Sequence, residues 1–282
     1  MLEIKSYTSV TRFDLARTLF GRGRYWTAAY WVDGIMVDTG CAHTARELVQ
    51  ALANTPLTRI VNTHSHEDHI GANGSLQRQR KGLEILAHPL ALPVLADPRG
   101  TQSLHPYRRV FWGYPEPSRG NPLPDGAVIE TEHHRFRVIY TPGHSPDHLC
   151  LYEPTQGWLF TGDLFVGGQE RALRSDYDIW QIIASLKRIV ALPMNMLFPG
   201  SARVRENPAK EVAGKITYLE ELGERVLTLH RQGRSVRDIV RRLCGGPMLV
   251  EFLTLGHFSR RWLVLAYLRT QRGMELQQEA ML

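Results

Sequence analysis

The sequence predicts a layered α/β domain followed by a small helical domain. Over roughly the first 200 residues, short β-rich runs alternate with turns and a few helical stretches, and this mixture is typical of an α/β or α+β layered fold. From about residue 205 onward, apolar residues recur instead at spacings of three and four, which predicts helices. We therefore expect a first domain at residues 1–204 and a helical domain at residues 205–282.

Turn residues and alternating side chains mark the elements of the first domain. Residues 25–32 and 34–38 are β-rich and flank Asp33-Gly34, a dipeptide that favours a tight hairpin turn. Apolar residues at helical spacing predict a helix over 179–189, with Asp178 as its N-cap. Further strands are expected at residues 57–62, 135–140, 149–152 and 158–161.

Three helical patterns and an excess of basic residues characterise the second domain. Apolar residues form a stripe over 212–229, a capping box opens a second helix at 235–238, and a third helical pattern covers 258–268. Residues 202–282 contain 14 Lys and Arg but only 9 Asp and Glu. Such a surface could bind an anionic partner such as RNA, or it could simply be solvated. We favour the second interpretation, because no run of basic residues or stacking aromatics accompanies the charge.

The composition is that of a globular protein and excludes several other classes. Of the 282 residues, 43% are hydrophobic and 22% are charged, which excludes a disordered tail or a fibrous repeat. No apolar stretch reaches the ~20 residues of a transmembrane helix, and the N-terminus lacks an apolar run of secretory length. Three cysteines are too few for a disulfide framework. We expect a cytoplasmic protein that does not contact membranes.

One hexapeptide concentrates three histidines. The segment 64–69 reads His-Ser-His-Glu-Asp-His and follows an apolar strand, so it forms a loop at that strand's carboxyl end. The alternating His64 and His66 can hold one metal ion, while Asp68 and His69 face a neighbouring position. Zinc favours this mixture of nitrogen and oxygen ligands. A loop that crowds these histidines without a metal would be costly.

Two further strand ends carry metal-ligating residue types. His144 follows Pro142-Gly143 after one predicted strand, and Asp163 follows Thr161-Gly162 after another. Each motif alone is weak, since a single histidine or aspartate at a strand end is usually a turn residue. Their occurrence together, in this order behind the histidine loop, is a strong signal.

These motifs together resemble the metallo-β-lactamase superfamily. The resemblance covers about residues 20–205 and includes Val37-Asp38-Thr39-Gly40 as the family's early aspartate motif. It implies a four-layer αββα sandwich with metals at the edge between two sheets, and it makes residues 1–204 the catalytic domain. The tail at 205–282 resembles the winged-helix-type domain of glyoxalase II-like hydrolases and of the β-lactamase-like endoribonuclease branch.

The resemblance also implies a role for each site residue. Asp38 would orient the metal loop without touching the metal. Apart from the resemblance, His148 lies four residues after His144, and we expect it to support a ligand or to lie on a helix surface. The implied metal ligands fall into two sets that share one carboxylate: His64, His66 and His144 for the first ion, Asp68 and His69 for the second, and Asp163 bridging both.

One position departs from the family pattern. The family usually supplies a last histidine in a Pro-Gly-His turn, but this chain has Pro199-Gly200-Ser201. Because a neutral serine hydroxyl is a poor zinc ligand, we expect one firmly bound Zn²⁺ and a second that is weak or absent. Iron and manganese are the alternative metals.

The loop at residues 98–124 offers a candidate substrate surface. It contains Tyr107, Arg108, Arg109 and Trp112, which could line a substrate mouth and bind a carboxylate or phosphate. A loop packed on the domain by its own aromatics explains the same residues equally well.

The expected function is metal-dependent hydrolysis of a small-molecule ester, thioester, lactone or related bond. A Zn²⁺-bound water has its pKa lowered to ~7, which provides hydroxide at neutral pH. Asp68 would orient this nucleophile or shuttle its proton. Two alternatives remain: a mononuclear-iron enzyme that oxidises persulfides, and an RNA-binding nuclease. Metal analysis separates the first alternative, and salt-dependent RNA affinity would support the second.

Overall fold

The computed structural model describes residues 1–279, which form two compact units. The first unit comprises residues 1–141, 146–166 and 193–208. The second comprises residues 142–145, 167–192 and those from 209 onward. The second unit therefore contains most of the predicted helical domain, whose last three residues, 280–282, lie outside the described residues.

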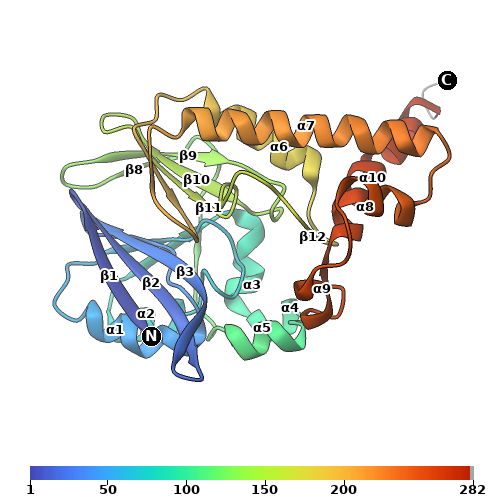
Figure 1. The fold of residues 1–282 in the computed structure, drawn as a ribbon. Helices are drawn as coiled ribbons and strands as arrows, with labels where there is room; N and C mark the ends of the chain where they lie inside the picture. The colour runs from blue at the N-terminus through green and yellow to red at the C-terminus, as the bar shows by residue number, and fades with distance from the viewer. Residues whose placement is uncertain (280–282) are drawn as a thin grey trace. The chain divides into compact units, whose positions relative to one another are not determined.

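The first sheet begins as an antiparallel meander (Figure 1) and continues as a parallel sheet. Its strands follow one another in space as in sequence: antiparallel pairing joins β1 through β4, and parallel pairing joins β4 through β7. The strands are β1 (Leu2–Tyr7), β2 (Val10–Leu19), β3 (Arg22–Val32), β4 (Ile35–Val37), β5 (Arg59–Val61), β6 (Glu84–Ala87) and β7 (Asn121–Pro122).

The second sheet of the first unit has the order β14-β13-β11-β10-β9-β8. Its pairings are antiparallel, apart from the parallel pair β11 and β13. The strands are β8 (Val128–Glu130), β9 (Arg135–Tyr140), β10 (Leu149–Glu153), β11 (Trp158–Gly162), β13 (Met196–Pro199) and β14 (Arg205–Glu206). The predicted mixture of strands and helices is confirmed.

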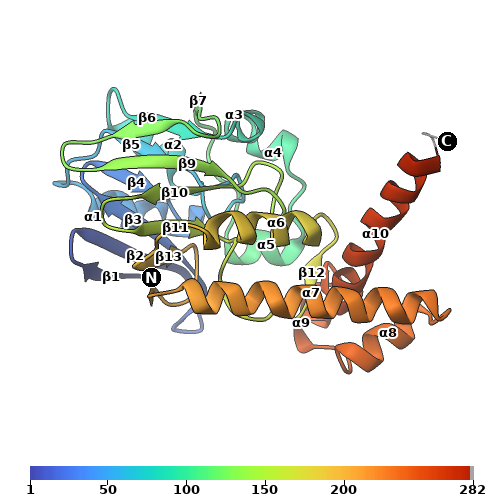
Figure 2. The ribbon, with the colours of Figure 1, turned by 90° about the horizontal axis from the view of Figure 1, so that it is seen from above.

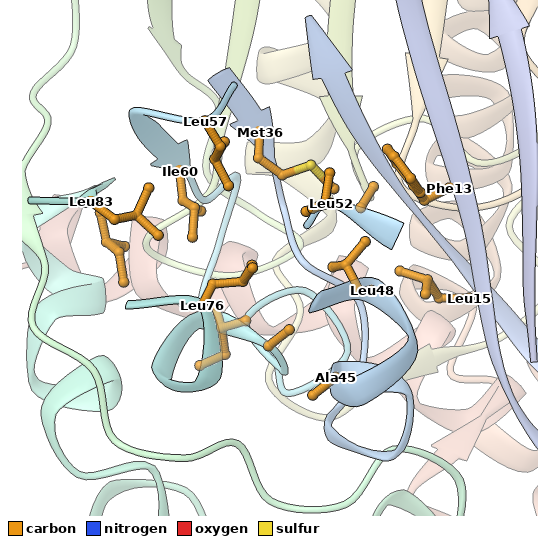
Figure 3. Close-up of a cluster of buried hydrophobic side chains, with 14 of the residues drawn as sticks. Phe13, Leu15, Met36, Ala45, Leu48, Leu52, Leu57, Ile60, Leu76 and Leu83 are labelled. Carbon is orange, nitrogen blue, oxygen red and sulfur yellow. The ribbon is translucent and has the colours of Figure 1, made fainter. Parts of the chain in front are cut away.

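Short helices complete the first unit. They are the 3₁₀ turns η1 (Ala42–Thr44) and η2 (Pro89–Ala91) and the helices α1 (Ala45–Ala51), α2 (Asn73–Gln79), α3 (Leu92–Ala96), α4 (Pro98–Thr101) and α5 (Pro106–Phe111). Leu48 and Leu76, from α1 and α2, pack with Met36 and Ile60 of the sheet in one buried apolar cluster (Figure 3).

A second apolar cluster lies between the two sheets. Val37 and Val61 of the first sheet share it with Phe136 and Phe160 of the second. Neighbouring residues of one strand point to opposite faces, so Met36 and Val37 enter different clusters. This two-sided burial explains why the central strands are almost wholly apolar, and it fixes the register at which they end.

The predicted hairpin turn is confirmed. Asp33 and Gly34 have φ values of 45° and 81° and connect β3 to β4. Two consecutive left-handed residues are what a two-residue type I′ turn requires, and Asp-Gly meets this requirement at low cost.

The second unit consists mainly of helices (Figure 2). They are α6 (Ile179–Val190), α7 (Ala209–Arg231), α8 (Val236–Leu243), α9 (Leu249–Leu253) and α10 (Arg260–Glu279), with the short strands β12 (Leu173–Arg174) and β15 (Phe258–Ser259) paired antiparallel. Asp178 caps α6 by accepting bonds from the backbone N–H groups of Trp180 and Gln181, both at 3.0 Å, as predicted. Ser235 caps α8 in the same way. Within the described residues, no helix has the length and apolar character needed to cross a membrane.

Candidate metal centre

The candidate site lies where the parallel strands β4 and β5 end. Because the carboxyl ends of paired parallel strands meet at one edge, Asp38 after β4 is brought beside the loop at 62–70 after β5. In this loop His64, His66 and His69 are 0%, 7% and 0% exposed. Three imidazoles withdrawn from water in this way need polar partners.

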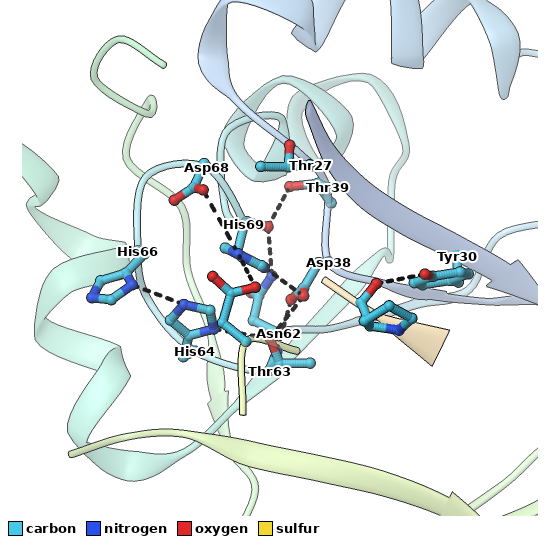
Figure 4. Close-up of polar contacts among 12 residues, drawn as sticks. Thr27, Tyr30, Asp38, Thr39, Asn62, Thr63, His64, His66, Asp68 and His69 are labelled. Atoms are coloured by element: carbon cyan, nitrogen blue, oxygen red, sulfur yellow. Dashed lines mark hydrogen bonds and ion pairs between the residues drawn. The ribbon is translucent and has the colours of Figure 1, made fainter. Parts of the chain in front are cut away.

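Asp38 holds the histidine loop through three hydrogen bonds (Figure 4). One carboxylate oxygen accepts from the backbone N–H of Thr63 at 2.8 Å. The other accepts from the Thr63 hydroxyl at 2.7 Å and from Nδ1 of His69 at 2.8 Å. Asp38 is itself buried and has a left-handed backbone with φ of 59°, which aspartate tolerates better than most residues. Its carboxylate thereby fixes the orientation of the His69 ring.

The hydrogen bonds around Thr63 determine which nitrogen of His64 carries the proton. Since the Thr63 hydroxyl donates to Asp38, its oxygen accepts from Nδ1 of His64, at 3.0 Å. Nε2 of His64 then presents a lone pair, and it lies 2.9 Å from Nδ1 of His66. Two imidazole nitrogens thus converge on one point, as ligands of a metal do.

Nε2 of His69 is directed at two carboxylates. It lies 3.8 Å from Oδ2 of Asp68 and 3.6 Å from Oδ1 of Asp163, and it has no hydrogen-bond partner among residues 1–279. One donor atom each from His64, His69 and Asp163 fall within 4.8 Å of one another. A buried nitrogen in such surroundings requires an explanation, and a bound cation supplies one.

The electrostatics of the cluster also fit a cation. Burial raises the pKa of Asp68 to about 7, and the nearby carboxylates of Glu67 and Asp163 contribute in the same direction. For His69, burial lowers the pKa, but Asp163, Asp38 and Asp68 outweigh that effect and hold the pKa well above its usual value. The site therefore concentrates negative charge around imidazole donors. This combination of nitrogen and oxygen donors suits zinc.

His148 positions the end of β11, where Asp163 lies. Nδ1 of His148 is 2.9 Å from the Thr141 hydroxyl, and Nε2 accepts from the backbone N–H of Asp163 at 3.2 Å. Burial lowers the pKa of His148 to about 4, so the ring is neutral and can accept this bond. Gly162 is required here, because a Cβ at its left-handed position would lie 2.6 Å from Oγ1 of Thr63.

Comparison with known proteins identifies the family of this arrangement. A family model described as the metallo-beta-lactamase superfamily matches residues 27–201.

The chain belongs to the metallo-beta-lactamase superfamily.

Two relatives indicate the general chemistry. The chain is 26% identical over 212 residues to an atrochrysone carboxyl ACP thioesterase of Aspergillus fumigatus, covering 72% of this chain and 59% of the relative. It is 30% identical over 179 residues to a hydroxyacylglutathione hydrolase of Legionella pneumophila, covering 62% of this chain and 60% of the relative. The matches thus span about 60% of each relative's length. In general terms, they support a metal-dependent hydrolase.

The fold agrees with solved members of the superfamily. A metallo-beta-lactamase family protein from Thermus thermophilus has a TM-score of 0.65 and 21% sequence identity, and the likeness covers 94% of both chains. A metallo-beta-lactamase from Pontibacter korlensis has a TM-score of 0.61 and 20% identity, covering 78% of this chain. The predicted fold class is therefore confirmed.

The superfamily's second histidine motif lies in the loop at 142–145. This loop groups with the second unit, where the ring of His144 contacts that of Tyr177 with centroids 4.5 Å apart. Nε2 of His144 lies 3.5 Å from the Tyr177 hydroxyl. The backbone N–H of Asp178 donates to the carbonyl of Gly143 at 2.9 Å, which fastens the loop to the start of α6.

The position where superfamily members carry a last histidine is Ser201. It follows Gly200, whose backbone lies directly against the cluster: a Cβ there would be 2.6 Å from Oδ1 of Asp163 and 2.7 Å from Cε1 of His69. The turn is held by the guanidinium of Arg12, which donates to the carbonyl of Ala202 at 2.6 Å. The turn that contains Ser201 is thus firmly held.

The predicted substrate loop differs from expectation in one residue. Arg108 is buried, and its guanidinium forms a two-pronged ion pair with the fully buried carboxylate of Glu67, with Nε 2.6 Å from Oε1. Its guanidinium therefore braces the histidine loop and is not exposed to a substrate. Tyr107 and Trp112 are half-buried with their ring centroids 6.1 Å apart, and Arg109 donates to the carbonyl of Leu104 at 2.8 Å. Much of this loop packs on its own aromatics.

Several residues that hold the histidine loop carry no recognisable signal in the sequence. Asp147 accepts from the backbone N–H of Ser65 at 2.8 Å, and Gln102 donates to the carbonyl of Ser65 at 2.9 Å. Asn73 donates to Oδ1 of Asn62 at 2.7 Å inside the loop. Their separations in sequence are irregular, so no spacing signal could have found them. The Glu67 carboxylate beside three histidines was the one available hint.

Proposed function

We propose that this protein is a metal-dependent thioester hydrolase. The observation that carries the proposal is the buried cluster of imidazoles and carboxylates at the ends of β4, β5 and β11. The names of both curated relatives describe hydrolysis of a thioester, in which the acyl group is carried by an acyl carrier protein or by glutathione. The chain's own substrate would be an acyl thioester of either kind.

In this proposal the ligands are those implied by the superfamily motif. His64, His66 and His144 would hold the first metal, as the superfamily motif implies. Asp68 and His69 would hold the second, with Asp163 shared. We propose zinc as the resident metal, because imidazole and carboxylate are the donors present. When bound, the metal supplies an activated water and polarises the carbonyl under attack.

The remaining chemistry belongs to side chains of this protein. Asp38 holds the His69 ring through Nδ1, and Thr63 holds His64, so both imidazoles stay in the tautomer that offers Nε2. His148 fixes the backbone N–H of Asp163. Asp68 would orient the nucleophilic water and accept or return its proton at a carboxylate oxygen. Such prepositioned groups lower the barrier because they need no rearrangement during the reaction.

The experiment that tests the proposal combines elemental analysis with small thioester substrates. We expect zinc in the purified protein, hydrolysis of a free acyl thioester, and loss of both in His66→Ala. His230→Ala is the matched control, since that imidazole is exposed near the end of α7 and belongs to none of the metal-donor groups found among the described residues. Iron together with oxygen consumption on a persulfide would overturn the proposal. RNA cleavage without thioester hydrolysis would overturn it as well.

We propose further that the segment from residue 205 onward is a winged-helix-type domain of a cytoplasmic protein. The support is the succession of α8, α9 and α10 together with the short strand β15, which pairs with β12 at residues 173–174, outside this segment. RNA is the alternative partner of this domain, and a steep fall of RNA affinity with added salt would favour it.

A further inference from the structure

The most unusual surface of the second unit is the outward face of α9. Four large apolar side chains stand in solvent within seven residues: Leu249, Phe252, Leu253 and Leu255 are 74%, 65%, 58% and 80% exposed. Single exposed apolar residues are ordinary, but a contiguous group of this size marks an interaction surface. In Figure 1, α9 lies beside the start of α10, and the other end of α10 points away from it.

The backbone around this group is held in a costly conformation. Leu255 has φ of 52°, a left-handed geometry that a bulky side chain rarely adopts. Buried Thr254 fixes this turn: its hydroxyl donates to the carbonyl of Val250 at 2.8 Å and accepts from the backbone N–H of Phe258 at 3.2 Å. Strain of this kind persists where it serves a purpose other than stability. Here it projects a leucine that packs against almost nothing.

The residues around α9 are strongly basic, and all of the basic residues are arginines. Residues 231–261 contain seven Arg, no Lys and only two acidic residues. Both acids are engaged within the unit: Asp238 bonds Arg241 and Arg242 at 2.9 and 3.0 Å, and Glu251 accepts from the backbone N–H of Met248 at 3.3 Å. The segment of sequence that carries the apolar face therefore has a net charge of +5, with histidine neutral.

The exposed apolar side chains and the arginines together indicate the kind of partner. An apolar centre with arginine around it is the composition of protein interfaces, in which arginine is enriched and lysine depleted. Arginine binds carboxylates through two parallel hydrogen bonds, so the complementary surface is acidic with an apolar middle. The exposed group consists of three leucines and one phenylalanine, which offers little to stacked bases.

We propose that the exposed face of α9 is the docking surface for an acidic carrier protein that delivers the acyl thioester. The inference rests on the proposed function, and it selects the protein-borne thioester over the small-thiol one. The carrier's apolar residues would cover Phe252 and its three leucine neighbours, while its carboxylates pair with arginines of α8 and the start of α10, such as Arg237, Arg241 and Arg261.

The test is binding of a fluorescently labelled, purified acyl carrier protein to the full-length protein, measured by anisotropy. We expect Phe252→Ser and the double variant Leu249→Ser/Leu255→Ser each to weaken binding at least tenfold. Leu90→Ser is the matched control, because that leucine is 56% exposed in the first unit and should leave the affinity unchanged. Arg237→Glu should also weaken binding about tenfold, and added salt should weaken it further.

Hydrolysis of a free small thioester separates this inference from the proposed function. We expect the α9 variants to retain the wild-type rate on the free thioester, which also shows that they fold. Equal carrier affinity in wild type and Phe252→Ser would overturn the inference while leaving the proposed function intact. If no carrier protein binds, two other results would also overturn the inference. One is sedimentation of the protein with anionic phospholipid vesicles, and the other is a homodimer that Phe252→Ser converts to monomers.

Discussion

The histidine loop and the exposed face of α9 reverse the usual distribution of side chains in opposite ways. In the loop, three imidazoles and the Glu67 carboxylate are buried, and neighbours such as Asp38 and Arg108 hold His69 and Glu67. On α9, leucines and a phenylalanine are exposed and held outward by a strained turn. Burying polar groups and exposing apolar groups both lower the stability of the folded chain. Both regions are therefore explained by what they would bind.

The two regions differ in how strongly their side chains depend on contacts with neighbouring residues. Removing one support from the loop leaves a buried polar group without its partner, whereas removing a side chain from α9 only reduces exposed apolar area. Substitutions in the loop should consequently change stability and metal affinity together. Substitutions on α9 should change partner binding, with changes of only about 1 kcal/mol in the free energy of unfolding.

The largest effect is expected for Asp38→Ala. The change removes the acceptor for Thr63 and for Nδ1 of His69, so the His69 ring loses its fixed orientation. We expect metal affinity to fall about 10–100-fold and the free energy of unfolding to fall by about 3 kcal/mol. Zinc titration and urea denaturation measure the two effects. Asp97→Ala is the control, because Asp97 only caps α4 and should leave metal affinity unaltered. Wild-type metal affinity in Asp38→Ala would show that the loop does not depend on this carboxylate.

The next largest effect is expected for Gly200→Ala. The added methyl group would lie within 2.7 Å of both Asp163 and His69, so their donor atoms must move apart. We expect metal affinity to fall about tenfold, as for the loss of a supporting group. Gly214→Ala is the matched control, since nothing lies within 4 Å of that position in α7. It should raise the free energy of unfolding by roughly 0.5–1 kcal/mol. If Gly200→Ala bound metal as tightly as the wild type, the close approach of Gly200 to Asp163 and His69 would be contradicted.

A gain of function is expected for Ser201→His. The turn around Gly200 is already held by Arg12, so a histidine at 201 would restore the missing superfamily ligand. We expect the affinity for a second metal ion to rise about tenfold, with the first unchanged. Isothermal titration with zinc measures both, and Ser201→Ala should behave as wild type. Two equally tight ions in the unmodified protein would mean that another residue replaces the missing histidine.

The smallest effect is expected for Leu255→Gly. Glycine adopts the left-handed φ of 52° without strain, and an 80% exposed leucine contributes almost no burial. We expect the free energy of unfolding to rise by about 1 kcal/mol, while affinity for the carrier protein falls. Leu249→Gly is the control: it lies in a helix, where glycine should lower stability by about 1 kcal/mol. A Leu255→Gly protein less stable than wild type would show that this leucine contributes to the fold.

Features that depend on residues close together in the sequence were predictable. The Asp33-Gly34 turn, the caps at Asp178 and Ser235 and the mixed strands and helices all follow from local chemistry, and the structure agrees. The histidine loop was visible as well, since its donors lie within six residues at the end of an apolar strand. Metal occupancy and the ligand roles remain predictions.

Features that join distant residues were not predictable. The buried pair of Arg108 and Glu67 links positions 41 residues apart. The histidines beside Glu67 were a hint, but no neighbour of Arg108 in the sequence marks it as buried. Exposure was equally hidden: residues 249–255 resemble an ordinary apolar helix segment in sequence, although four of them face solvent. Whether a charged or apolar side chain is buried depends on packing partners that periodicity alone does not identify.

The crowding of carboxylates around His69 makes the folded protein a reporter of metal supply. Asp68 and Asp163 both lie near Nε2 of His69 and repel each other, and a cation at this point would relieve that repulsion in the native state only. Any ligand that binds only the native state stabilises it in proportion to the logarithm of its concentration, by about 2.7 kcal/mol at a hundred times Kd. The thermal transition would then shift with free zinc. A chelator would lower the melting temperature, and starvation for the metal would increase the fraction of chains open to proteolysis.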